Sequence, residues 1–103
     1  MFVGSVTQAR KPEGYRQQAV TTAAALANIP PAATYALIFV EDQGVRTRDD
    51  GTAPTTTVGM AYAAGAVIEL NSRRQINAFR VISLTGTAEL NISFYSADKK
   101  AYA

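Results

Sequence analysis

The sequence predicts an all-β fold: a small antiparallel β-sandwich or jelly-roll-like barrel of about six to eight strands with an extended N-terminal arm. Two observations lead to this fold class. Short segments rich in β-branched and aromatic residues recur about every 8 to 12 residues, with turn-forming residues between them. No segment carries a convincing helical period. A chain of 103 residues is also the size of one small domain.

The N-terminal part differs from the rest. Residues 1–18 are polar, contain Gly4, Pro12 and Gly14, and show no sustained period. We therefore assign residues 1–18 to an N-terminal arm and residues 19–103 to a single β-sandwich domain. Because such a segment has little to pack on its own, we expect the arm to contact a neighbouring subunit.

Two strands have clear patterns. Residues 34–41 ("TYALIFVE") are apolar on both faces, which predicts a central strand buried on both sides. Residues 87–95 ("TAELNISFY") alternate apolar and polar side chains, as a half-buried antiparallel strand does. Three further strands are expected at residues 44–48, 66–70 and 76–84.

Residues 18–31 ("QAVTTAAALANIPP") are ambiguous. Their alanines favour helix, whereas Val20 and the threonines favour strand. No N-cap followed by glutamate opens the segment, and Pro30-Pro31 ends it. We favour a strand over a helix here.

The step from residues 76–84 to residues 87–95 holds only Thr85-Gly86. So short a connection predicts a tight hairpin between the two strands. Across that hairpin we expect Arg80 to pair with Glu89. A contact between Arg80 and another subunit is the alternative.

Composition excludes several function classes. There is no cysteine and no histidine, which removes thiolate sites, the commonest general base and the commonest transition-metal ligand. No glycine-rich phosphate loop and no serine–histidine arrangement is present. We therefore expect no enzymatic activity, no cofactor and no metal.

A net charge of +2, with its basic pairs scattered, argues against nucleic acid as the main partner. No apolar run is long enough to span a membrane, and the N-terminus has no signal-peptide pattern.

The segment "RTRDDGTAPTTTVG" at residues 46–59 is the strongest candidate for a site. Neighbouring strand residues point to opposite faces, so Asp49 and Asp50 do not converge on one ion unless a loop folds them together. Asp-Gly is a strong turn pair, and Pro54 then forces an extended exit. A turn is therefore expected, with a partner-binding loop as the alternative, and the threonines at 55–57 are expected to form strand.

Arg46 and Arg48 lie two residues apart on a strand and so share one face. Their side chains are either exposed to solvent or paired with nearby acids, or they contact a partner, because arginine is enriched at protein interfaces. Arginines, lysines and acids near the arm, this loop and residue 73 together make up the predicted interface. Its residues are Arg10, Lys11, Arg16, Arg46, Arg48, Asp49, Asp50, Arg73 and Arg74.

Three motifs resemble those of a known group of proteins. They are R-x-R-D-D-G-x-x-P-T-x-x-x-G at residues 46–59, I-x-x-F-R-x-I at 76–82 and A-x-L-x-I-S-F-Y at 88–95. The chain is similar, over about residues 20–95, to small β-sandwich virion structural proteins of tailed bacteriophages. The resemblance implies a head decoration or cement protein, or a neck or tail component, and implies no catalytic residue.

On this basis we expect a non-enzymatic virion protein, assembled in the host bacterial cytoplasm, that binds the major capsid protein or other virion proteins. It is expected to form a homo-oligomer, a dimer or trimer, because repeated modest contacts on a shell reinforce one another. The alternative is a neck, tail or fibre-associated β-module that binds a ligand or receptor.

Overall fold

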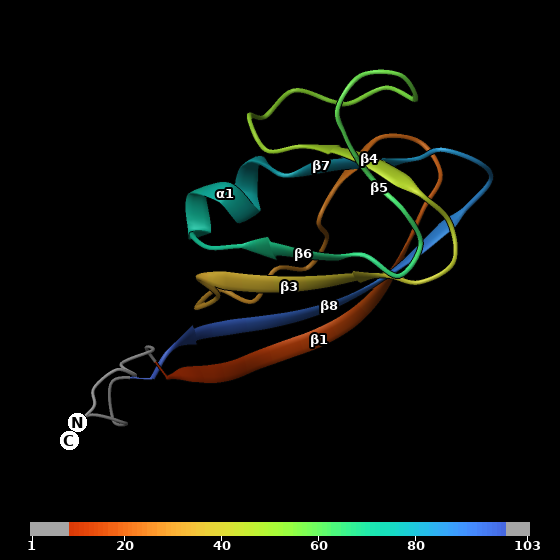
Figure 1. Ribbon diagram of the computed structural model, residues 1–103. Helices are drawn as coiled ribbons and strands as arrows, with labels where there is room; N and C mark the ends of the chain where they lie inside the picture. The colour runs from red at the N-terminus through yellow and green to blue at the C-terminus, as the bar shows by residue number, and fades with distance from the viewer. Residues whose placement is uncertain (1–8, 99–103) are drawn as a thin grey trace, which may run out of the picture.

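The computed structural model describes residues 9–98, which form two four-stranded antiparallel sheets (Figure 1). Sheet A has the strand order β1 (Arg10–Val20), β8 (Ala88–Ala97), β3 (Tyr35–Val40), β6 (Val67–Leu70). Sheet B has the order β2 (Ala24–Ala25), β7 (Arg80–Ser83), β4 (Val45–Arg48), β5 (Met60–Tyr62). A short helix, α1 (Arg73–Ala78), joins β6 to β7. The predicted all-β sandwich is confirmed, and neither sheet closes into a barrel.

The hydrophobic core lies between the two sheets. In β8 the alternate residues Ala88, Leu90, Ile92 and Phe94 are buried, as the sequence pattern predicts. Burying one such side chain contributes roughly 1.5–3 kcal/mol, so this face of β8 is a large part of the driving force for folding. The other sheet A strands add Val20, Ala36, Ile38, Val40, Ile68 and Leu70, and Val45, Val81, Phe79 and Ile76 close the core from the other side.

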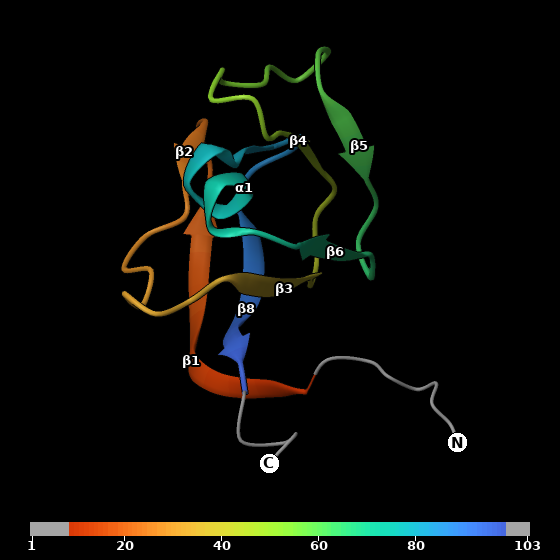
Figure 2. The same cartoon turned by 90° about the vertical axis from the view of Figure 1, so that its left-hand side faces the viewer.

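The predicted boundary of the N-terminal arm is wrong. From Arg10 onward the segment is β1, the edge strand of sheet A, which pairs antiparallel with β8 from Arg10↔Ala97 to Val20↔Ala88. Figure 2 shows the two strands side by side along their length. A register shift between Pro12 and Gly14 accommodates the proline, which has no N–H to donate. Most of β1 is exposed, so no hydrophobic period marks it in the sequence. Residues 1–8 of the predicted arm lie outside the described residues.

The predicted hairpin between residues 76–84 and 87–95 is also wrong. Residues 76–78 are helical, and the strand that follows, β7, pairs with β4 and β2 in sheet B. β8 belongs to sheet A, so the Thr85-Gly86 step carries the chain from one sheet to the other. The expected Arg80–Glu89 pair does not form. Arg80 donates instead to the backbone oxygens of Asn77 and Phe79, at 2.9 and 2.8 Å.

Helix α1 was not expected, although its start signal is present in the sequence. Ser72 is the N-cap, and its hydroxyl accepts a hydrogen bond from the Gln75 backbone N–H at 3.1 Å. The Gln75 side chain reaches back to the Asn71 N–H at 2.8 Å. This is close to the reciprocal capping arrangement that serine and glutamine three residues apart provide. The helix buries only Ile76, so it carries no recognisable amphipathic period.

The remaining strands are close to expectation, with one correction. Strands lie within 34–41, 44–48 and 66–70, and the strand expected at 87–95 runs from Ala88 to Ala97. The strand favoured for 18–31 is present only as the end of β1 and the two-residue β2. β3 is an interior strand, but it is not buried on both sides. Ala36, Ile38 and Val40 face the core, whereas Phe39 is 42% exposed on the opposite face.

Candidate functional site

The loop at residues 49–59 connects β4 to β5 and reverses the chain, as predicted. Gly51 adopts a φ of +84°, a conformation that glycine reaches without steric cost. Asp50 accepts a hydrogen bond from the Thr52 backbone N–H at 3.1 Å, which is the aspartate turn expected of this residue type. The Gly51 N–H donates to the Ala78 carbonyl at 3.1 Å and so fixes the loop to the end of α1.

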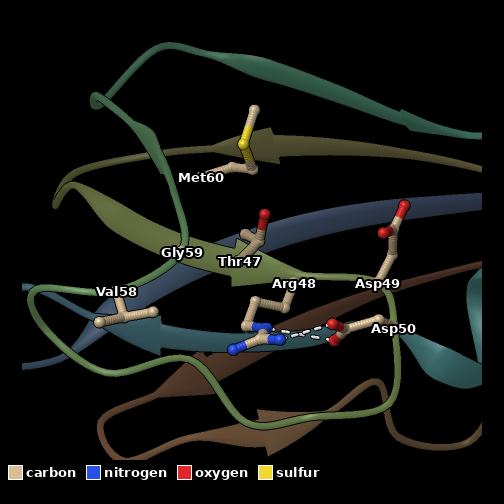
Figure 3. Close-up of a pocket in the computed structure, with 7 residues that line it drawn as sticks. All are labelled: Thr47, Arg48, Asp49, Asp50, Val58, Gly59 and Met60. Atoms are coloured by element: carbon tan, nitrogen blue, oxygen red, sulfur yellow. Dashed lines mark hydrogen bonds and ion pairs between the residues drawn. The ribbon is translucent and has the colours of Figure 1, made fainter.

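The two neighbouring aspartates diverge, as strand geometry predicts. Asp49 accepts a hydrogen bond from the Gln75 side chain at 2.8 Å. Asp50 receives both the Nη2 and the Nε of Arg48, at 2.5 and 3.1 Å. Figure 3 shows Arg48 and Asp50 facing each other while Asp49 points away. Among residues 9–98 no group of three or more carboxylates comes together to hold a metal ion.

The Arg48–Asp50 pair determines the electrostatics of the loop. The hydrogen bond from Arg48, followed by that from the Thr52 N–H, lowers the pKa of Asp50 below its ordinary value. The same hydrogen bond to Asp50 raises the pKa of Arg48. Both groups therefore stay charged at neutral pH. A carboxylate held in this way is a poor general base, because its proton affinity is reduced.

Arg46 lies on the same face of β4 as Arg48, as predicted. The alternate residues Val45 and Thr47 are buried and point into the core. Its Nε donates to the Thr56 carbonyl at 3.1 Å, and its Nη1 donates to the Gly59 carbonyl at 2.7 Å. The arginine thus anchors the far side of the loop to β4 through backbone carbonyls.

The threonines at 55–57 lie in this loop and not in a strand, contrary to expectation. The Thr55 hydroxyl accepts hydrogen bonds from the backbone N–H groups of Thr57 and Val58, at 3.2 and 2.9 Å. Local hydrogen bonds of this kind compete with the backbone hydrogen bonds of a sheet. They explain why these β-branched residues form a loop and not a strand.

Two adjoining hollows lie beside the loop. One of about 290 Å³ is lined by the end of β4, the two aspartates, and Val58 to Met60 (Figure 3). The other, of about 280 Å³, extends between β5, β6 and α1. Val58 and Met60 at the first hollow are 51% and 65% exposed. An open hollow with apolar walls and an ion pair already satisfied is suited to receiving a side chain of a partner.

Arg73 and Arg74, also in the predicted interface, lie on α1. Nη1 of Arg73 donates to the carbonyls of Pro30, Pro31 and Ala33, at 2.7, 3.1 and 3.1 Å. Arg73 therefore fastens the segment between β2 and β3. Arg74 is exposed.

Arg10, Lys11 and Arg16 lie on β1, away from the loop. Arg10 stacks over the Tyr35 ring, 3.6 Å from its centre, and Lys11 lies 4.0 Å from Glu13. Arg16 pairs in register with the buried Ile92, and its Nε is buried with no hydrogen-bond partner among residues 9–98. The predicted interface residues are therefore brought together only around residues 46–50 and are otherwise spread over β1 and α1.

The outer face of sheet A is a candidate surface that sequence reasoning missed. Tyr15, Phe39 and Val67 lie on this face and are 63%, 42% and 56% exposed. The signal was the second apolar face of residues 34–41, which we interpreted as burial under another layer. No described element covers it: sheet B and α1 pack on the opposite side of sheet A (Figure 1).

The described part of the chain contains no helix long and apolar enough to cross a membrane. Comparison with known protein families, curated proteins and solved structures finds no match to this chain.

Proposed function

We propose that the chain is a non-enzymatic structural protein of a tailed-bacteriophage virion, specifically a decoration protein that binds the shell of major capsid protein and stabilises the head. The proposal begins from the three sequence motifs described above. It places the protein in the virion, after assembly in the host cytoplasm, as a homo-oligomer in contact with capsid subunits.

The observation that best supports the proposal is the uncovered outer face of sheet A. A rigid sheet that exposes aromatic and aliphatic side chains in one patch is typical of a protein-binding surface. The charged residues near the 49–59 loop support a structural role, because each is engaged in holding a loop or a helix end. Arg46, Arg48 and Asp49 contact Gly59, Asp50 and Gln75 in this way.

The test is the copy number and position of the protein in purified particles. A decoration role predicts hundreds of copies of the protein on the shell. It should be possible to strip the protein from particles and bind it to them again, and particles without it should break at a lower temperature. Phe39→Ser is expected to weaken rebinding to stripped particles, because Phe39 is exposed at the centre of the patch. Ser93→Ala, on the same face in register with Leu37, is the matched control. A chain that never co-purifies with particles would contradict the proposal.

The hollow beside Met60 favours a second candidate, a neck, tail or fibre-associated module that binds a ligand or receptor. A copy number near six or twelve, at the neck or tail, would select this function over decoration. Met60→Arg would then abolish ligand binding and leave rebinding to the shell unchanged.

A further inference from the structure

The two outer faces of the sandwich differ in charge. On sheet A, the apolar strip of Leu37, Phe39 and Val67 is formed by register neighbours on β3 and β6. The carboxylates of Glu41, Glu69 and Glu89 surround this strip.

Hydrogen bonds hold two of these carboxylates in position on the face. Glu41 accepts from the side chains of Gln17 and Asn91, at 3.2 and 2.8 Å. Glu69 accepts from the Tyr35 hydroxyl at 2.6 Å. In the described part of the chain none of the three acids lies in a salt bridge, since the ion pairs there are Lys11–Glu13 and Arg48–Asp50. Arg10, which stacks over the Tyr35 ring, adds one positive charge to this face, so the three acids leave it with a net negative charge.

The outer face of sheet B carries the opposite charge. Arg46 and Arg48 on β4 are in register with Ile82 and Arg80 on β7, so three arginines surround one partly exposed isoleucine. Arg46 and Arg80 donate only to neutral backbone carbonyls, which leaves their charge intact. Asp50 neutralises Arg48 alone.

We propose that these faces bind each other between copies of this chain: the acidic outer face of sheet A in one copy contacts the basic outer face of sheet B in the next. Each face has a small apolar centre and a charged surround, and only the pairing of unlike faces brings opposite charges together. Pairing two sheet A faces would place like charges opposite each other, which is costly at an interface.

A contact between two different faces has a direct consequence for assembly. Because each copy keeps one free face of each kind, the contact does not end at a dimer but closes into a ring of at least three copies or extends further. This inference concerns contacts between copies of the purified chain and holds whether or not the chain belongs to a virion. On a virion shell the same sheet A face would contact capsid subunits, so in any one copy the two contacts exclude each other.

The test measures the molar mass of the full chain by sedimentation and light scattering over a range of protein and salt concentrations. We expect species of three or more copies at low salt that dissociate as salt rises from about 50 mM to about 500 mM, because exposed charges are then screened. A discrete two-fold dimer, a chain that remains monomeric at low salt, or association that strengthens with salt would overturn the proposal.

Two variants change one face each without removing a described side-chain contact. Ala19→Arg with Glu89→Arg removes the negative excess of the sheet A face, at two positions paired in register. Ala25→Glu with Ala61→Glu adds acids beside Arg80 and Arg46. Each double variant should weaken association by roughly ten-fold or more. In an equimolar mixture only the unchanged sheet A face of one variant and the unchanged sheet B face of the other remain complementary, so pairs of unlike variants should form.

Arg74→Glu is the matched control, since Arg74 is exposed on α1 and lies on neither face. Circular dichroism and thermal unfolding establish that every variant folds. Association that responds to the sheet A variant but not to the sheet B variant would show pairing of like faces and would contradict the proposal.

Discussion

Sheets A and B hold their strands together in different ways. In sheet A, β1 and β8 stay paired over ten register pairs, and β8 pairs with β3 over six more. In sheet B, β2 pairs with β7 over two residues and β5 pairs with β4 over three. The connections of sheet B are instead fastened by arginines: Arg46 holds the 49–59 loop, and Arg73 holds residues 30–33.

The difference shows how a small domain without disulfides can keep long connections in place. A backbone ladder satisfies its own donors and acceptors, so sheet A needs only an apolar inner face. Short strands leave carbonyls unpaired, and a guanidinium can donate to several of them because it carries five N–H groups in a fixed plane. We expect sheet A to determine global stability and sheet B to determine local order.

The largest effect is expected from Phe94→Ala in the core face of β8. Phe94 is 1% exposed, and truncating a buried phenylalanine costs about 3–5 kcal/mol. Urea unfolding followed by circular dichroism measures the loss. Ser93→Ala, at the preceding position, which faces outward, should change the free energy of unfolding by less than about 0.5 kcal/mol. Equal losses at the two positions would refute the assignment of the two faces.

Gly59→Ala should have the next largest effect, in sheet B. Gly59 has a φ of +133°, and an added Cβ would lie 2.9 Å from the Thr47 carbonyl and 3.1 Å from the Pro54 Cβ. Backbone strain alone costs roughly 1–3 kcal/mol, and the clash adds to it. Gly51→Ala, with a φ of +84° and open space around the Cβ, is the matched control that carries strain only. The denaturant midpoint of Gly59→Ala should therefore be lower than that of Gly51→Ala.

Arg46→Leu tests whether arginine holds the 49–59 loop. It leaves the Thr56 and Gly59 carbonyls without their side-chain donor, at an expected cost of about 1–3 kcal/mol. Hydrogen exchange should rise within residues 49–59 while the β1–β8 ladder keeps its protection. Arg74→Leu, on an exposed arginine, serves as control. If exchange in both sheets rose together, the expectation that sheet B determines only local order would fail.

The smallest effect is expected from acid pH at Asp50. Its pKa is lowered in the folded chain, so its contribution to stability is present above the unfolded-state value of about 3.9 and is lost as pH falls through the lower folded value. Asp50→Asn should therefore flatten the pH dependence of the unfolding midpoint below about pH 4. Unchanged pH dependence in this variant would show that the Arg48–Asp50 pair contributes nothing.

Some of the site could be predicted from residue chemistry. The Asp-Gly turn, the divergence of Asp49 and Asp50, and the common face of Arg46 and Arg48 all follow from local geometry. The partners of these groups could not be predicted, because they come from distant segments: Gln75 lies on α1 and Ala78 at its end. The expected contacts with other subunits stay predictions.

The sequence by itself determined the all-β class and the inner face of β8, because alternation of apolar side chains is a local property of the strand. It also determined the turn at Gly51. Only the tertiary structure decided which sheet each strand joins. β7 and β8 follow each other across Thr85-Gly86 yet lie in different sheets, and β1 is a strand because β8 offers it an edge. The physical reason is that the free energy of packing the whole core determines which strands pair. That free energy depends on residues far apart in the chain and cannot be evaluated from a short segment of sequence.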